Sequence, residues 1–149
     1  KKATEARNSL WREIGTSNRT VWGIKKKLLK YRLTSYYPAE TSNITGSGLT
    51  TSDFEVNEYG WYTYNGKLVM AGATEELLST GYSYRQENKH YFNYFDEIRV
   101  QIDGFWYDAI ILDSSGASHW PGYFRLDMFV IDAAHVKDTT ILIEIEEEN

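Results

Sequence analysis

Cysteine is absent from the sequence, which excludes a disulfide framework, a thiolate metal site and a cysteine nucleophile. Only three histidines are present, and His90 and His135 stand in no metal-binding spacing, so we expect neither a metal ion nor a cofactor. Apolar runs are a few residues long, far below the roughly 20 residues that cross a bilayer, which excludes a membrane span. A glycine-rich phosphate loop and the Gly-x-Ser-x-Gly elbow of serine hydrolases are also missing.

Positive charge is scarce outside the first part of the chain. Residues 1–30 hold nine Lys or Arg and two Glu, whereas residues 31–149 hold seven Lys or Arg and nineteen Asp or Glu. The net charge of −5 therefore combines a basic start with an acidic body, and we place a boundary near residue 30. The acidic body argues against nucleic-acid binding, because phosphates attract basic surfaces.

The 149 residues, 42% of them apolar and 15% aromatic, suffice for one domain with a buried core. Within residues 4–30, Leu10, Ile14 and Leu28 recur near the helical period, which predicts one or two amphipathic helices. This N-terminal helical segment is expected to pack on the body or to dock on another domain or chain. Its lysine run at 25–27 is interpreted as a solvated face, with contact to an anionic polymer as the alternative.

After residue 30 the pattern changes to short β-strands. Segments 61–64 and 67–70 flank Asn-Gly, a dipeptide that favours the positive φ angles of a tight hairpin turn. Segment 97–102 alternates with period two, and Asp-Gly separates it from the returning segment 105–112. Many short strands with few helices indicate a barrel or a sandwich. Further strands are predicted at 31–37, 125–131 and 140–145, short helices at 73–79 and 132–136, and loops at 39–52 and 82–95.

Two aspartates stand in surroundings that are unusually apolar for a charged side chain. Asp113 ends the run Ala-Ile-Ile-Leu, and Asp127 lies among large apolar residues in a predicted strand. A carboxylate is rarely buried without a partner, and burial raises its pKa towards that of a general acid at neutral pH. Two such groups in one cleft are typical of acid/base catalysis at glycosidic bonds. Arg125 is the expected partner of either one. The alternative is that each Asp only accepts structural hydrogen bonds.

The loop between these aspartates is rich in small and aromatic residues. Ser115 and Gly116 allow a backbone to approach a ligand closely, and Trp120 has a ring suited to stacking on a sugar. Tyr37 extends this aromatic platform in our interpretation. His119 is a candidate second acid/base or substrate hydrogen-bond donor, and the alternative is a solvated loop histidine.

Segments 109–117 (AIILDSSGA) and 125–129 (RLDMF) resemble the 3D, or three-aspartate, domain. That family has an apolar run, then Asp-Thr-Gly-Gly-Ala, then Arg-Ile-Asp-x-Phe. Segment 31–37 is similar to the first strand of the family. Segment 48–52 (GLTTS) is similar to its Gly-Ile-Thr-Ala-Ser-Gly motif, which makes Thr51 a substrate-binding candidate.

The resemblance implies a mainly β fold over residues 31–149, namely a six-stranded double-psi β-barrel with short helices behind the helical segment 1–30. Lytic transglycosylase A, rare-lipoprotein-A-like domains and expansins share that barrel. The resemblance also implies cleavage of the MurNAc–GlcNAc β-1,4 bond of peptidoglycan strands without water, which leaves a 1,6-anhydro product. Asp127 matches the acid/base of the family, and Asp113 matches the aspartate that flanks and orients it.

The sequence departs from the family at segment 69–74, which has no Asp where the family has another of its three. A non-catalytic module that binds cell wall or carbohydrate, or a structural module of a surface or virion protein, is therefore the alternative to an enzyme. Both functions predict an extracellular or cell-wall location, or a place in a phage virion. Because the chain begins Lys-Lys and shows no signal peptide, we expect a processed piece of a longer chain.

Overall fold

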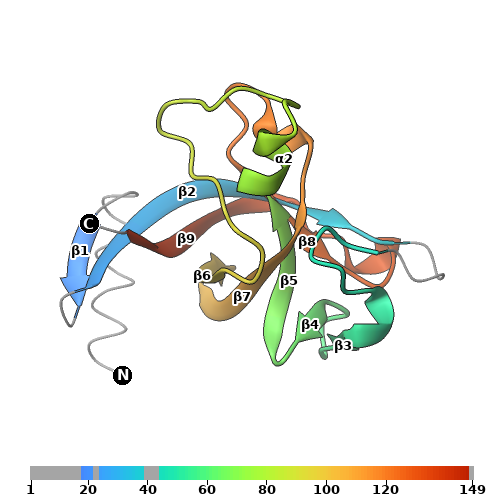
Figure 1. The fold of residues 1–149 in the computed structure, drawn as a ribbon. Coiled ribbons are helices and arrows are strands. Elements are labelled where there is room, and N and C mark those ends of the chain that lie inside the picture. Colours follow the sequence, from blue (N-terminus) through green and yellow to red (C-terminus); the bar gives the residue numbers. More distant parts are fainter. Residues whose placement is uncertain (1–17, 22–23, 39–43, 148–149) are drawn as a thin grey trace.

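The computed structural model describes residues 18–21, 24–38 and 44–147, and this part of the chain is mainly β (Figure 1). Nine strands form one sheet, joined by short helical segments. In chain order the elements are β1 (Asn18–Val21), β2 (Ile24–Tyr36), η1 (Thr51–Asp53), β3 (Glu55–Val56), β4 (Tyr62–Tyr64), β5 (Lys67–Gly72), α2 (Glu75–Ser79), β6 (Glu97–Ile102), β7 (Phe105–Ser114), η2 (Ala117–His119), β8 (Arg125–Phe129), η3 (Ala133–His135) and β9 (Thr139–Glu147).

Six of these strands close into a barrel. Their order around it is β2, β9, β6, β7, β5, β8 and back to β2. The β2/β8 and β5/β7 contacts are parallel, and the other four are antiparallel. β1 extends β2, and β4 with β3 extends β5, so these three strands lie outside the ring. The predicted six-stranded barrel is confirmed.

Every contact in the ring joins the two halves of the chain. The first three barrel strands along the sequence are β2, β5 and β6, and the last three are β7, β8 and β9. Each of the six ladders pairs one strand of the first group with one of the second. Exchanging β2 with β7, β5 with β8 and β6 with β9 reproduces the same set of contacts, parallel pairs included. The barrel is therefore built from two interlocked units of three strands.

The barrel core follows from the period-two alternation of the strands. On β2, Tyr31 and Leu33 are buried inside, whereas Arg32 between them is exposed. A second apolar cluster, which includes Phe54 and Phe129, is separate from this interior. Burying each aliphatic side chain of such clusters contributes about 1.5–3 kcal/mol. The interior cluster contains Tyr31, Leu33, Trp61, Leu68, Met70, Phe92, Ile98, Val100, Ile102, Ala109, Ile111, Leu126, Met128, Val130, Ile141, Ile143 and Ile145.

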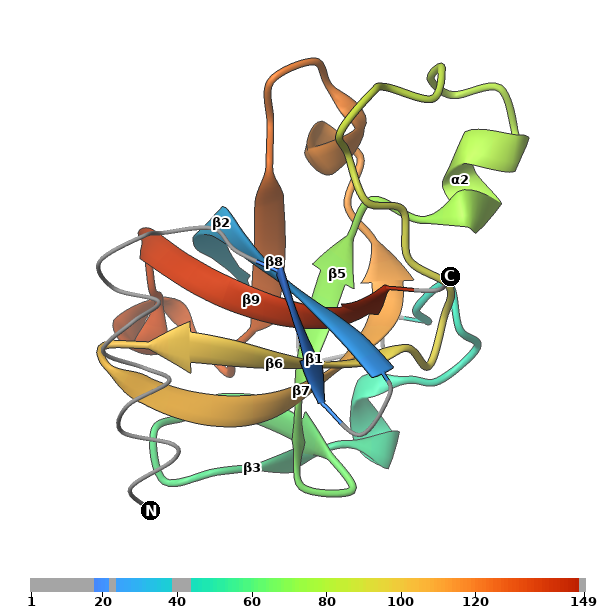
Figure 2. The same cartoon turned by 90° about the vertical axis from the view of Figure 1, so that its left-hand side faces the viewer.

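Two long connections lie together at one end of the barrel. In Figures 1 and 2 the yellow-green segment that includes α2 and the orange segment around η2 lie side by side beyond the ends of β5 and β7. Hydrogen bonds from Gln86 and Lys89 to the backbone of residues 118–120 join the two connections. No helix in the described ranges is both long and apolar enough to cross a membrane.

The hairpins are confirmed together with their turns. β4 and β5 flank Asn65-Gly66, with φ of 50° and 78°, and β6 and β7 flank Asp103-Gly104, with φ of 51° and 86°. Both central residues of each turn thus have the positive φ that such two-residue turns require. The strands predicted at 125–131 and 140–145 correspond to β8 and β9. The helices predicted at 73–79 and 132–136 correspond to α2 and the single turn η3.

The helix predicted at residues 4–30 is wrong for the residues that the structure describes there. Residues 18–21 form β1, and β2 begins at Ile24 and runs through residue 30 without interruption. The basic stretch pairs with the acidic C-terminal strand β9, and Lys26 Nζ lies 3.1 Å from Glu146 Oε1. This pairing between distant segments overrides the local helical spacing. Residues 1–17, where the rest of the helical segment was predicted, lie outside the described residues.

Candidate functional site

Ala71 of β5 lies between the two predicted aspartates. It pairs with Asp113 on the parallel neighbour β7 and with Asp127 on the antiparallel neighbour β8. The β5/β7 register shifts after Met70, which pairs with Ile111, so Leu112 is the extra residue of a bulge. Since neighbouring strands are about 4.8 Å apart, the two aspartate backbones flank Ala71 at about 10 Å from each other.

Both aspartates line one pocket of about 330 Å³. Ala71 is part of its lining, and the loop after β7 contributes Ser115 and Gly116. Strand β8 contributes Arg125 as well as Asp127. The structure therefore brings together five of the nine predicted site residues. The complete lining is Tyr36, Ala71, Asp113, Ser114, Ser115, Gly116, Ala117, Arg125, Asp127 and Phe129.

Side-chain hydroxyls hold both oxygens of Asp127. Thr34 Oγ1, on the neighbouring strand β2, donates to Oδ1, and Ser115 Oγ donates to Oδ2 over 3.2 Å. Arg125 Nη2 lies 3.8 Å from the same Oδ2, and 19% of the aspartate side chain is exposed. A hydroxyl both donates and accepts hydrogen bonds, so the same partners accommodate either protonation form of this carboxyl group. Asp127 is thus reachable and fixed in orientation.

Backbone groups hold Asp113. The amides of Gly46 and Ser114 both donate to Oδ1 over 2.9 Å. Burial raises the pKa of Asp113 above its usual value, and the two backbone hydrogen bonds oppose that rise. The negative charge of Glu76 adds slightly to it. Because both amides donate to one oxygen, the protonated form of Asp113 carries its proton on the other, Oδ2.

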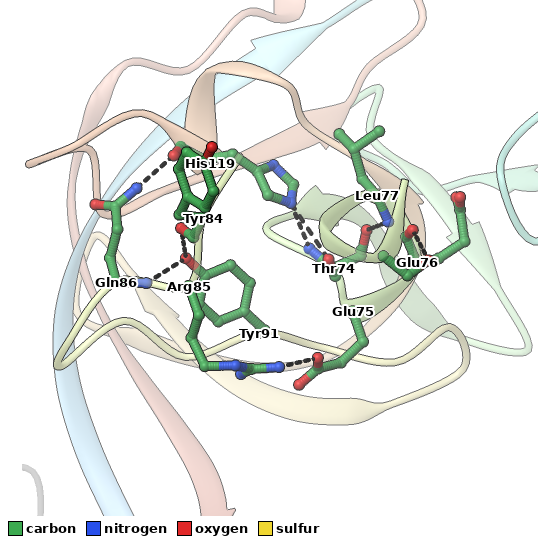
Figure 3. A network of polar contacts seen from close by, with 10 residues as sticks. Thr74, Glu75, Glu76, Leu77, Tyr84, Arg85, Gln86, Tyr91 and His119 are labelled. Carbon is green, nitrogen blue, oxygen red and sulfur yellow. Dashed lines mark hydrogen bonds and ion pairs between the residues drawn. The ribbon is translucent and has the colours of Figure 1, made fainter. Parts of the chain in front are cut away.

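The structure places His119 inside the protein, which corrects the prediction of a solvated or substrate-facing loop histidine. Its side chain is fully buried, and the Thr74 amide donates to Nε2 over 3.1 Å (Figure 3). Nε2 is therefore an acceptor, which leaves the proton on Nδ1, 2.9 Å from the Ser115 carbonyl oxygen. His119 ties the start of α2 to the loop that carries Ser115 and does not line the pocket.

A buried lysine fixes the other side of the same loop. Lys89 is only 8% exposed, and its ammonium group donates to the carbonyl oxygens of Ser118 and Trp120, each over 2.7 Å. Burial lowers the pKa of Lys89. Gln86 also donates to the His119 carbonyl, and Figure 3 shows how its segment packs around Tyr91 next to the imidazole ring. The long connection before β6 thus holds the loop in place.

Three other predicted substrate contacts lie outside this pocket. Tyr37 and Trp120 are about half exposed, at 54% and 49%, so their rings are available to a ligand. Thr51 opens the short helix η1 and does not belong to the lining. Thr34, by contrast, was not predicted, although it lies in a predicted strand. The signal that would have found it is the parallel register with Asp127, which the sequence does not contain.

No group of three or more His, Asp or Glu side chains within the described ranges is arranged to hold a metal ion. The site consists instead of two carboxyl groups, an arginine and hydroxyl groups around a small pocket. Such an arrangement is suited to proton transfer. No protein-family model, curated protein or solved structure matches this chain.

Proposed function

We propose that the protein is a peptidoglycan-cleaving enzyme of the lytic transglycosylase type, with Asp127 as its acid/base. The observation that carries this proposal is the convergence of Asp113 and Asp127 on one pocket across Ala71. Two carboxyl groups in different surroundings are the usual means of breaking a glycosidic bond. The proposed substrate implies a place in the cell wall, outside the cell, or in a phage virion.

The reaction needs one group that first gives and then takes a proton. In the proposed mechanism, protonated Asp127 donates to the glycosidic oxygen while the bond from that oxygen to the muramyl C1 breaks. The resulting carboxylate accepts the proton of the muramyl C6 hydroxyl, whose oxygen then bonds to C1. The 1,6-anhydro ring closes without consuming water, and Asp127 regains its proton. Asp113 orients the sugar, and its raised pKa makes it the second candidate for the proton donor.

We also propose that the barrel is a double-psi barrel. Support comes from the interlocking of two three-strand units and from the two parallel contacts, β2/β8 and β5/β7. Exchanging the two units turns one of these parallel contacts into the other. Asp113 follows the apolar run 109–112 inside β7, and Asp127 is the central residue of β8. These positions agree with the order of the motifs in the 3D domain.

Digestion of purified peptidoglycan tests the function. The wild-type protein, Asp127→Asn and Asp113→Asn are compared, with products identified by mass spectrometry. Asp108→Asn is the matched control, because it makes the same change on β7 at an exposed residue outside the pocket. We expect 1,6-anhydro-muropeptides from the wild type and the control, and a loss of about 10²-fold or more in Asp127→Asn. Reducing-end products would instead indicate a hydrolase.

A binding module is the second candidate function. Two observations favour it. Backbone hydrogen bonds fix Asp113, and segment 69–74, which contains Ala71, has no third aspartate. In that case the wild type releases no soluble product but sediments with insoluble cell wall. Sedimentation would then be the same for Asp127→Asn and for the wild type within about twofold, because no proton transfer is involved.

A further inference from the structure

A second and larger pocket, of about 710 Å³, adjoins the candidate site. Arg125 lines both pockets, and Thr34, which lines the second, donates to Asp127 of the first. The volume is within the range of about 300–1,000 Å³ that is common for small-molecule sites. Its lining is Lys30, Tyr31, Arg32, Thr34, Gly122, Tyr123, Phe124, Arg125, Asp138 and Thr140.

The strand registers explain why the two pockets are continuous. Along β2, Lys30, Arg32 and Thr34 alternate with core residues, so these side chains share the outer face of the barrel. Arg32 pairs with Arg125 on β8, and Thr34 pairs with Asp127. The side chains of both strands therefore form one polar strip from the second pocket to the candidate catalytic carboxylate.

The second pocket retains positive charge after its internal ion pair is counted. Arg32 is neutralised by Asp138, to which its Nε and Nη2 donate over 2.9 Å. Lys30 has no ion-pair partner among the residues that the structure describes. Arg125 has the 3.8 Å contact with Asp127 and a longer-range attraction to Asp138. The pocket thus favours an anion.

The buried Nε–H group of Arg125 donates no hydrogen bond to the described residues. Its Nε is inaccessible to solvent, and no acceptor among the described residues receives a hydrogen bond from it. Leaving a charged donor unsatisfied in this way costs free energy, so such an atom calls for an explanation. The Arg125 side chain as a whole is 26% exposed, and a turn of its guanidinium group would present Nε–H to a carboxylate, which matches the planar group.

Aromatic rings border this cationic region. Phe124 and Tyr123 line the pocket and are 39% and 46% exposed. Trp120 packs edge-on against Tyr123 with ring centroids 5.5 Å apart, so the exposed rings are neighbours. Rings of this kind present apolar surface to the C–H face of a sugar, while their edges remain in water.

We infer that the second pocket binds a carboxylate carried by the glycan, with the guanidinium group of Arg125 and Lys30 as its partners and Phe124 and Tyr123 against the sugar. This inference rests on the proposed function, since it names the group of the same substrate that is recognised beside the cleaved bond. In peptidoglycan the carboxylate has two sources. It is the lactyl group of a muramyl residue without its stem peptide, or it belongs to the stem peptide itself.

Three soluble probes separate these sources in an NMR titration at constant pH. N-acetylglucosamine has no carboxylate, and N-acetylmuramic acid differs from it only by the lactyl group. Muramyl dipeptide has its lactyl group blocked as an amide and carries its carboxylate on the peptide. The signal followed is the Arg125 Nε–H cross-peak, assigned by its loss in Arg125→Gln. We expect this peak to shift with one or both carboxylate probes and to stay unmoved by N-acetylglucosamine.

Two variants test the contributions of Lys30 and Arg125 to binding. Lys30→Ala should weaken binding of the responding probe by up to roughly fivefold, as for a partly exposed charge pair, and Arg125→Gln by roughly tenfold or more. Lys25→Ala is the matched control, because it removes another exposed lysine of β2 outside the pocket. The same spectra report whether each variant is folded.

The outcomes distinguish this inference from the proposed function. A shift with N-acetylmuramic acid alone assigns the lactyl group, a shift with muramyl dipeptide alone assigns the stem peptide, and both together assign a general carboxylate site. An equal shift with N-acetylglucosamine, or no shift with any probe at its solubility limit, overturns the inference. These results do not depend on cleavage, so the enzyme proposal fails separately if peptidoglycan stays intact while Arg125 still responds.

Discussion

Asp113 and Asp127 lie on either side of a single residue, Ala71, on its two neighbouring strands, although fourteen positions separate them in the sequence. They reach this arrangement by different routes, since β7 runs parallel to β5 and β8 runs antiparallel to it. Their partners also differ, because Asp113 accepts from two backbone amides and Asp127 from two hydroxyl groups. The pair therefore consists of one carboxyl group held by backbone amides and one held by hydroxyl groups that accommodate both of its protonation forms.

Asp113→Asn should alter how stability depends on pH. Because burial raises the folded-state pKa of Asp113 above its usual 3.8, the native state holds this proton longer than the unfolded chain. The wild type therefore loses stability as pH rises from 3.8 through the raised value, and the loss persists above it. Asn keeps an acceptor for both amides and does not titrate. We expect the variant to gain unfolding free energy relative to the wild type as the pH rises above about 3.8.

Urea unfolding at several pH values measures this difference. Asp108→Asn again serves as the control, because Asp108 is exposed on the same strand. A constant difference between wild type and Asp113→Asn over the whole pH range would contradict the prediction.

Thr34→Val should reduce peptidoglycan cleavage without unfolding the protein. The substitution removes the hydroxyl that donates to Asp127 Oδ1 while keeping the shape of the side chain. A hydrogen bond to a charged group is worth about 1.5–3 kcal/mol, so we expect kcat to fall roughly tenfold to a hundredfold. Thr34→Ser keeps the hydroxyl and should retain most of the activity. Equal rates for the two variants would show that the hydroxyl plays no part.

His119→Ala should destabilise the protein and loosen the site loop. The buried Thr74 amide loses its acceptor and the Ser115 carbonyl loses its donor, and a cavity forms where the ring was. Together these effects should lower the unfolding free energy by roughly 2–4 kcal/mol in urea denaturation. His135→Ala, at a partly exposed histidine, should cost several times less. Similar losses for both variants would refute the structural role of His119.

Lys89→Met should make the loop after β7 open more often. The methionine fills similar space but donates nothing to the Ser118 and Trp120 carbonyls. We expect amide hydrogen exchange at residues 118–120 to accelerate roughly tenfold or more, and β6 to remain protected. Lys137→Met removes a more exposed lysine that pairs with Asp103 and should leave this exchange unchanged. Uniform acceleration across the protein would indicate global destabilisation instead.

Local sequence signals were sufficient for the hairpins and for singling out two aspartates that line one pocket. Asn65-Gly66 and Asp103-Gly104 readily adopt the positive φ angles of a two-residue turn. Each hairpin turn therefore depends on residues adjacent in the sequence and can be predicted from them. The pocket as a whole was less accessible to prediction. The bulge at Leu112 aligns Asp113 with Ala71, and the residue types of this segment do not indicate a bulge. Likewise, the burial of His119 depends on a connection that precedes it by about thirty residues.

The failure at the N-terminal end has a different cause. The apolar residues of 24–30 fit a helix and a strand almost equally well, and local spacing cannot separate the two. The charge distribution contained a better signal, because the lysines of 25–27 are complementary to the glutamates of 144–147. Across the β2/β9 ladder Lys26 is opposite Glu146, and their side chains form an ion pair. Opposite charges facing each other across two strands stabilise the pairing.

The interlocked halves of the barrel have a consequence for how the chain folds. When β2, β5 and β6 have been synthesised, none of them has a barrel neighbour, because all their ring partners follow the turn at Asp103-Gly104. The barrel strands of the first half therefore keep unpaired edges until the second half has been synthesised. During that interval the chain is exposed to aggregation. The high sequence separation of these contacts predicts slow and highly cooperative folding. Two fragments cut at that turn should be unfolded alone and should complement each other when mixed.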